Sequence, residues 1–200
     1  MRPTTLDPAA EQALAERCRE VVADPARIRV RFPAAAREIA RTPGTSPAPG
    51  GDRIEDRVRV RLLDALAQGL PDPDARAAEV RDLYRYGDAD ERRAVLLALP
   101  RLGLHGRVVD LLHDALRTND PRLVAAALGP YAATYLDDEA WRQGVLKCLF
   151  VGVPLRLVDG VDQRADDELR RMVADYADER RAAGRPVPDD ALPLLTSRET

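Results

Sequence analysis

The chain has 200 residues, of which 45% are hydrophobic, 32% are charged and only 4% are aromatic. This length suits one ordinary domain that can bury a core. Acidic and basic residues are interleaved, the net charge is −3 at pH 7 and the isoelectric point is about 5.5. These values exclude a strongly basic surface for nucleic acid. Abundant small aliphatic residues with few aromatic ones favour packed helices over a β-sandwich.

The two cysteines, Cys18 and Cys148, are widely separated and form neither a disulfide framework nor a pair of metal ligands. Their scarcity indicates a reducing compartment. The first residues, MRPTTLDPAAEQ, lack the apolar core of a signal peptide. No apolar run approaches the roughly 20 residues that cross a bilayer. We therefore expect a cytoplasmic protein that is not an integral membrane protein, with no cofactor and no metal site.

Residues 1–41 predict an N-terminal helical segment. Asp7 followed by Pro8 is typical of a helix start. Residues 27–32 alternate strictly, as in a short strand, but their apolar members also fit a helical stripe. Because Pro33 disfavours α geometry in the residue before it, we expect a second helix from Pro33 to about residue 41. The conformation of residues 26–33, where this helix would begin, stays open.

Residues 42–51, TPGTSPAPGG, have the composition of a flexible linker. After it, residues 52–195 predict one helical domain, in which Asp52 is expected to cap the first helix. Residues 196–200 are expected to be a disordered tail.

The helical domain contains a weak internal repeat, because an offset of 32 residues aligns Val80 with Leu112 and Leu96 with Leu128. Helix hairpins of about this length are the units of HEAT-like solenoids. We predict an all-α fold of stacked antiparallel helix hairpins, in either a HEAT-like short solenoid or an irregular helical bundle.

The stretch from residue 131 to 153, YAATYLDDEAWRQGVLKCLFVGV, is unusual because it holds four of the eight aromatic residues. It also holds Lys147, the only lysine among 31 lysines and arginines. Asp137 and Asp138 are suited to cap a helix whose faces are almost all apolar, including Phe150. This helix is therefore expected to be central and buried. Asp138 and Arg142 are spaced for an ion pair along it.

Several motifs in and after this stretch resemble the EboA family, the A-component proteins of bacterial ebo metabolite-trafficking gene clusters. They are Pro-Tyr at 130–131, Trp-x-Gln at 141–143, Val-Leu-Lys-x-Leu-Phe at 145–150, and Tyr-Ala-x-Glu-Arg followed by Gly-Arg within 176–185. Gly129 stands where the family often has asparagine. The resemblance is dense over residues 119–195, looser over 28–118 and absent before that.

The resemblance implies a helical cytoplasmic protein that acts in secondary-metabolite precursor traffic. It implies partners encoded in the same gene cluster, among them a prenyltransferase-like membrane protein and several enzyme-like proteins. It supplies no catalytic residues. A sugar-phosphate isomerase activity, with which some members are labelled, has no matching TIM-barrel pattern in this sequence.

Polar and aromatic residues near Lys147 are the candidates for a ligand site or a buried polar network. Gln143 lies one turn before Lys147 and shares its helical face. Lysine is a slim point charge whose pKa falls on burial, so Lys147 could pack between helices or contact a bound anion or carbonyl. The candidate residues are Tyr131, Tyr135, Trp141, Gln143, Lys147, Arg164 and Arg185.

Two function classes follow. The first is a non-enzymatic helical adaptor that binds partner proteins or a small metabolite, and it is favoured because the motifs of common catalytic sites are absent. The second is an enzyme with a helical pocket around Lys147 that acts on an acidic or phosphorylated substrate. The two histidines, His105 and His113, would stand about 12 Å apart on one helix, too far to share a metal.

Overall fold

The computed structural model describes residues 6–39 and 49–196, which form α-helices and short 3-10 helices without a strand. The predicted all-α class is confirmed. The α-helices are α1 (Pro8–Ala23), α2 (Ile28–Glu38), α3 (Ile54–Gly69), α4 (Pro73–Tyr86), α5 (Ala89–Ala98), α6 (Val109–Arg117), α7 (Pro121–Ala127), α8 (Pro130–Tyr135), α9 (Asp138–Val151), α10 (Val161–Arg164), α11 (Asp167–Ala182) and α12 (Leu192–Thr196). The 3-10 helices are η1 (Pro25–Arg27), η2 (Leu99–Arg101), η3 (Leu155–Leu157) and η4 (Asp189–Ala191).

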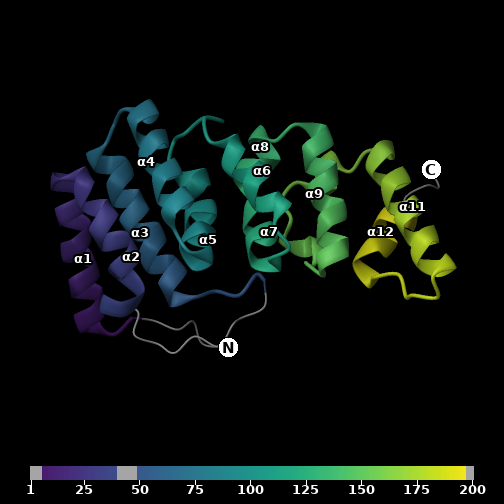
Figure 1. Cartoon of the computed structure of the whole chain (residues 1–200), viewed down its shortest axis with the longest axis horizontal. Coiled ribbons are helices and arrows are strands. Elements are labelled where there is room, and N and C mark those ends of the chain that lie inside the picture. Colours follow the sequence, from purple (N-terminus) through teal and green to yellow (C-terminus); the bar gives the residue numbers. More distant parts are fainter. Residues whose placement is uncertain (1–5, 40–48, 197–200) are drawn as a thin grey trace.

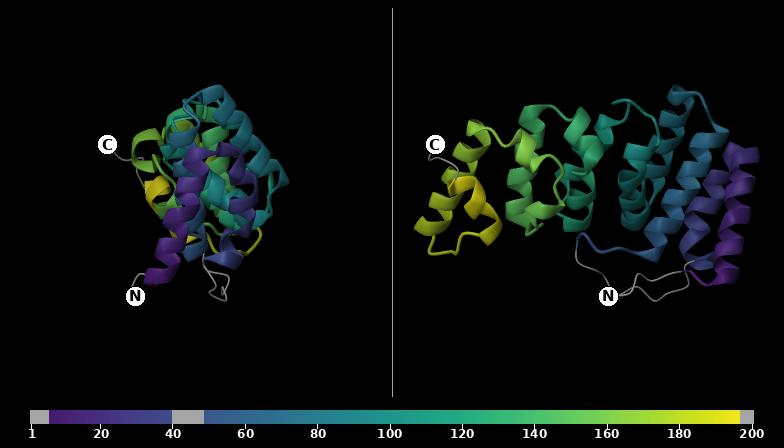
Figure 2. Two further views of the ribbon diagram at one scale, coloured as in Figure 1. Left: turned by 90° about the vertical axis from the view of Figure 1, so that its left-hand side faces the viewer. Right: turned by 180° about the vertical axis from the view of Figure 1, so that it is seen from behind.

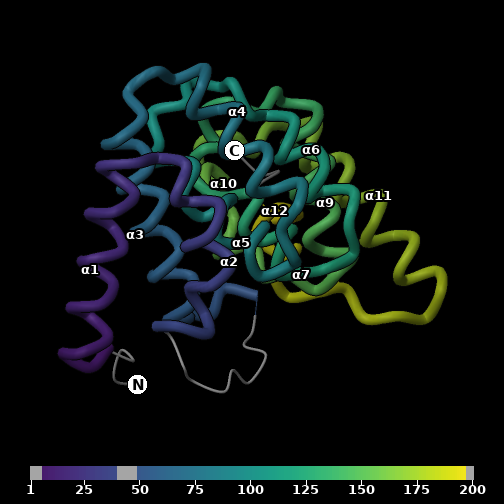
Figure 3. The backbone as a smooth tube through the Cα atoms, turned by 60° about the vertical axis from the view of Figure 1, so that its left-hand side comes forward, coloured from purple at the N-terminus to yellow at the C-terminus, as the bar shows by residue number. Residues whose placement is uncertain are grey.

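The helices follow one another along the long axis of the molecule, so that α1 and α12 lie at opposite ends (Figures 1 and 2). Helix α3 packs on α5, α5 on α7, α7 on α9 and α9 on α11. Helices α4 and α6 cover this row by packing on α5 and α7, while α1 and α2 pack on α3. Figure 3 shows α1 beside α3 at one end and α11 at the other. The helices that pack on each other are therefore chiefly one or two places apart in the chain.

Aspartate side chains begin most of the longer helices, because each accepts a hydrogen bond from a backbone N–H of the first turn. Asp88 and Glu91 form a full capping box at the start of α5. The prediction for Asp52 was wrong, since α3 begins at Ile54 and has Arg53 as its N-cap residue. The capping aspartates of the α-helices are Asp7, Asp72, Asp88, Asp120, Asp137 and Asp166.

Apolar stripes along the helices form the core. Leu62 and Leu66, one turn apart on α3, are fully buried. Both pairs of residues aligned by the 32-residue offset are also buried, namely Val80 with Leu112 and Leu96 with Leu128. Trp141 on α9 is the largest fully buried side chain of the described residues. Burial of such stripes, rather than helix propensity, stabilises helices of this length.

The second helix begins earlier than predicted. Helix α2 starts at Ile28 and continues through Pro33, and neither a strand at 27–32 nor a start at Pro33 is present. Proline inside a helix removes one backbone hydrogen bond. Here Ile28, Phe32 and Ala35 are almost completely buried on one face, and this burial outweighs the local preference.

Two regions of the prediction lie outside the described residues. Of the predicted linker, residues 42–51, only residues 49–51 are described. Of the predicted tail, residues 196–200, only residue 196 is described. Residues 49–53 run along one edge of the molecule to the start of α3 (Figure 1). They therefore pass close to helices much later in the chain.

Candidate functional site

Of the candidate residues predicted from the sequence, only Gln143 and Lys147 lie between α6 and α9. The Nζ of Lys147 donates a hydrogen bond to the Oδ1 of Asn119 at 2.7 Å, and its side chain is half-buried. Gln143 is exposed. Both residues line an open groove of about 650 Å³, which we call the α6–α9 groove. It is lined by Asp110, His113, Leu116, Arg117, Ala140, Gln143, Gly144 and Lys147.

The two predicted tyrosines contact each other and not this groove. The rings of Tyr131 and Tyr135 have centroids 4.7 Å apart. Tyr131 is buried, its hydroxyl accepts from the backbone N–H of Val108 at 3.4 Å, and burial raises its pKa. Among the described residues, no hydrogen bond joins either tyrosine to Gln143 or Lys147.

Trp141 and Arg164 form a separate cluster beside α8. The guanidinium carbon of Arg164 lies 4.8 Å from the centre of the Trp141 ring, a cation–π geometry. Arg164 also donates to the carbonyl groups of Ala132 and Leu136 at the end of α8, at 3.1 and 2.8 Å. The contact with Leu136 satisfies a carbonyl that the helix end leaves unpaired, while the carbonyl of Ala132 also accepts from the backbone N–H of Leu136. Arg185, beyond α11, is exposed and joins neither cluster.

Two further expectations for α9 were wrong. Arg142 pairs with Asp166 at 2.6 Å instead of with Asp138, which pairs with Arg164. Phe150 is 59% exposed, although its ring contacts that of Tyr176 at 4.8 Å. Helix α9 packs on α7, α6 and α11, and Phe150 lies away from the core.

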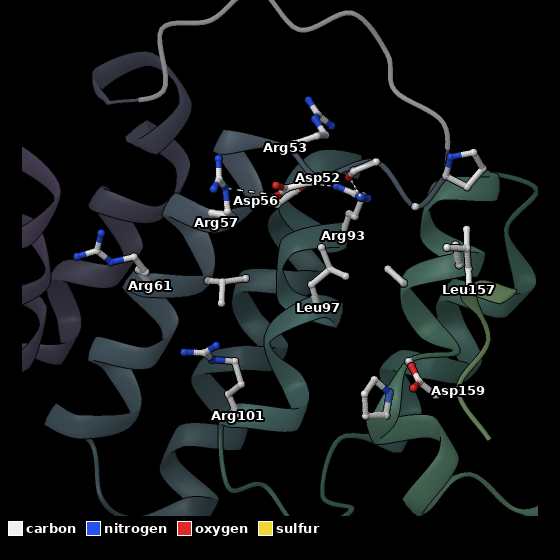
Figure 4. Close-up of a pocket in the computed structure, with 18 residues that line it drawn as sticks. Asp52, Arg53, Asp56, Arg57, Arg61, Arg93, Leu97, Arg101, Leu157 and Asp159 are labelled. Carbon is white, nitrogen blue, oxygen red and sulfur yellow. Dashed lines mark hydrogen bonds and ion pairs between the residues drawn. The ribbon is translucent and has the colours of Figure 1, made fainter. Parts of the chain in front are cut away.

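A second groove, of about 640 Å³, lies between α3, α5 and α7 and was not predicted from the sequence (Figure 4). Arg53, the N-cap residue of α3, and Arg57 and Arg61 within α3 are four positions apart, which places them on one face. We call it the α3–α5–α7 groove. It is lined by Pro49, Gly50, Gly51, Asp52, Arg53, Asp56, Arg57, Val60, Arg61, Arg93, Leu97, Arg101, Ala125, Ala126, Gly129, Pro130, Leu157 and Asp159.

A buried ion pair joins two helices at this groove. The guanidinium of Arg93 on α5 contacts the carboxylate of Asp56 on α3, and the two residues are only 3% and 4% exposed. Arg93 also donates to the carbonyl oxygen of Gly51 at 2.9 Å, which holds the segment before α3 against the groove. Burial, together with the nearby Arg53 and Arg122, lowers the pKa of Arg93 to about 10, so Arg93 remains protonated at pH 7.

The other arginines of the groove form ion pairs nearer to solvent. Arg101 makes a two-point contact with Asp64 at 2.5 and 2.9 Å, yet its side chain is still 60% exposed. Arg61 pairs with Glu11 of α1 in a comparably exposed position. Exposed pairs of this kind contribute only about 0–1 kcal/mol. Their arginines are therefore available to other anions.

One side of the groove carries arginines, each of which has a carboxylate partner, and the other side is more apolar. Figure 4 shows Arg57, Arg61 and Arg101 on one side of Leu97, with Leu157 and Asp159 on the other. Leu97 is 38% exposed although it is apolar. A Cβ on Gly50 would overlap the end of the Leu157 side chain, so the backbone at residue 50 lies close against Leu157.

The sequence carried only a partial signal for this groove. The spacing of Arg53, Arg57 and Arg61 was visible, but arginine is so frequent in this chain that the spacing did not stand out. The rarity of lysine pointed instead to α9. Burial of Arg93 with Asp56 depends on the packing of α3 on α5, which the sequence pattern does not reveal.

Within the described residues, no cluster of three or more histidine, cysteine, aspartate or glutamate side chains is placed to hold a metal ion. Among these same residues, no helix is both long enough and apolar enough to cross a membrane.

The stacked helices define an all-α protein whose described surface includes an arginine-rimmed, partly apolar groove. The chain belongs to the EboA family, whose model, described as metabolite traffic protein EboA, matches residues 27–195. The match includes the segment predicted as a linker and begins near α2. No curated protein and no solved structure matches the chain.

Proposed function

We propose that this protein is a non-enzymatic helical adaptor in secondary-metabolite precursor traffic, which holds a small-molecule intermediate in the α3–α5–α7 groove. The observation that supports the proposal is the combination of size and lining in this groove. Its volume of about 640 Å³ falls within the range of small-molecule sites. The family name supports a role in metabolite traffic.

The chemistry of the lining favours holding a molecule over transforming it. The basic groups of the groove are arginines, which stay protonated near neutral pH. General acid–base catalysis needs a group with a pKa near the working pH. Burial has lowered the pKa of Arg93 only to about 10. A bound molecule would therefore meet fixed charges and apolar surface.

A carrier of this kind passes its cargo to other proteins. The partners we propose are proteins of the same gene cluster, including a prenyltransferase-like membrane protein, and the proposed setting is the cytoplasm. The open groove suits such transfer, because a bound molecule would keep one side accessible.

Native mass spectrometry can test the proposal. The protein is incubated with an organic extract of bacteria that carry the gene cluster, and bound molecules are compared before and after release. We expect a molecule from the extract to bind the wild type and to be chemically unchanged on release. The same molecule should not bind the Leu97→Asp variant. A bound molecule that is released as a different compound, or one retained by Leu97→Asp, would contradict the proposal.

The α6–α9 groove supports a second candidate function, an enzyme acting on an acidic or phosphorylated substrate. The supporting observation is that Lys147 and Gln143 share this groove with His113, and histidine is the side chain most often used as a general acid or base. Conversion of a compound in the same extract, abolished by both His113→Asn and Lys147→Met, would favour the enzyme over the adaptor.

A further inference from the structure

We infer that the ligand of the α3–α5–α7 groove is a monomeric amphipathic anion: an apolar chain or ring system that carries one phosphate or carboxylate group. This inference rests on the proposed function and specifies the class of its cargo. It is carried by the unequal distribution of charge and apolar surface within the groove.

The anionic group fits the side formed by α3 and η2. Arg101 uses its Nε and Nη2 atoms on Asp64, while its Nη1 atom makes no hydrogen bond to the described residues. Its side chain is 60% exposed. Arg61 lies on the same side of Leu97 (Figure 4). Guanidinium groups match the geometry of phosphate and carboxylate, and charge-assisted hydrogen bonds are stronger than neutral ones.

The apolar part fits the opposite side. Leu157 supplies aliphatic surface there together with Ala125 and Ala126 of α7 and Pro130 of α8, and Leu97 lies between this side and the arginines (Figure 4). An apolar molecule that covers the partly exposed Leu97 removes its surface from water, which is favourable in proportion to the area buried.

The carboxylate of Asp159 gives the ligand a direction. Asp159 is exposed and lies on the Leu157 side of the groove (Figure 4). An anionic group placed beside it would be repelled, whereas one beside Arg101 would meet the Nη1 donor that Asp64 does not use. The anionic group therefore points towards α3 and η2, and the apolar part towards α7 and η3.

Size favours a single small molecule over a membrane surface or an acidic peptide. The groove is a recess of about 640 Å³, which matches a small ligand. Peptide recognition by strand addition or by an amphipathic helix uses a sheet edge or a long apolar groove. Here the groove is interrupted along one side by Arg57, Arg61 and Arg101.

The test uses soluble amphiphiles that share one decyl chain and differ only in the head group. They are decyl phosphate, decyl glucoside and decyltrimethylammonium, each below its micelle concentration, with inorganic phosphate as the head group alone. Binding is measured by calorimetry and located by NMR shifts of the Leu97 methyl groups. We expect decyl phosphate to bind at least about tenfold more tightly than the neutral and cationic probes.

Matched variants assign the charge selectivity to the groove. Arg101→Gln should weaken decyl phosphate binding about tenfold and leave decyl glucoside binding unchanged. Arg171→Gln on α11 is the control, because Arg171 makes the same two-point contact with Glu168 and is 56% exposed. The control should bind decyl phosphate like the wild type, and thermal unfolding checks that both variants fold.

The outcomes separate the ligand class from the function. Equal affinity for all decyl probes, or no binding of any of them, would overturn the inference that the ligand is an anion. The carrier function would still stand if a molecule from the extract binds the wild type and does not bind Leu97→Asp. Binding to phosphatidylglycerol–phosphatidylcholine vesicles without binding of monomeric decyl phosphate would overturn the class in favour of a membrane surface. Retained selectivity in Arg101→Gln would overturn the assignment of the anion to that side.

Discussion

The α3–α5–α7 groove and the α6–α9 groove have similar volumes but differ in how their charges are held. Arg93 in the first is buried against Asp56, whereas Lys147 in the second is half-buried and makes one hydrogen bond to Asn119. Burying a charge costs free energy unless the charge is paired, so the buried position of Arg93 depends on Asp56. The rarity of lysine in the sequence thus pointed to the α6–α9 groove, where the charged side chain is less tightly held than Arg93.

The largest expected effect comes from breaking the buried pair. Arg93→Ala should lower the free energy of unfolding by about 3–5 kcal/mol, because it leaves the Asp56 carboxylate buried without its partner. Urea unfolding followed by circular dichroism measures this loss. The double variant Asp56→Leu with Arg93→Met should recover most of it, since apolar residues can replace a buried pair. A loss below about 1 kcal/mol in Arg93→Ala would mean that the pair is effectively solvated.

A smaller loss is expected at Arg164, the predicted site residue that contacts Trp141. Arg164→Gln should cost about 1–3 kcal/mol, because the carbonyls at the end of α8 lose a charged donor. The same unfolding measurement applies. Arg171→Gln is the matched control and should change stability by no more than about 0.5 kcal/mol. Equal values for both variants would remove the structural role of Arg164.

Acid should weaken the ion pairs of Asp90, which link α5 to Arg53 and to Arg122 of α7, and the pair of Arg122 with Asp120 at the start of α7. The hydrogen bond from Arg53 lowers the pKa of Asp90, and that from Arg122 lowers the pKa of Asp120. A lowered folded-state pKa stabilises the fold above the unfolded pKa of about 3.9, and this stabilisation is lost as the pH falls through the folded pKa.

The free energy of unfolding should therefore decrease as the pH falls below about 5. Asp90→Asn should show a shallower decrease over the same range, because it lacks one of these carboxyls. Denaturant unfolding at a series of pH values checks both curves. Identical slopes in wild type and Asp90→Asn would exclude a contribution from the Arg53–Asp90 pair.

The smallest effect is expected at Lys147. Lys147→Met removes one hydrogen bond to Asn119 at a partly exposed position, so stability should change by no more than about 0.5 kcal/mol. Affinity for decyl phosphate should not change. An affinity loss as large as that of Arg101→Gln would move the ligand site to the α6–α9 groove and reverse the comparison.

Local signals in the sequence were sufficient for most of the fold. Aspartates such as Asp7 and Asp137 predicted helix starts where they occur, because capping depends on residues a few positions apart. The prediction failed at Pro33, where the burial of Phe32 against other helices outweighed a local rule.

Only the tertiary structure decided where the candidate site lies. Residues 49–61, 93–101, 125–130 and 157–159 meet because α3 packs on α5 and α5 on α7. In the sequence, Arg93 is one arginine among many, and nothing local distinguishes it from the exposed Arg171. Burial and pairing across helices make the difference, since the energy of a charge depends on its surroundings rather than on its residue type.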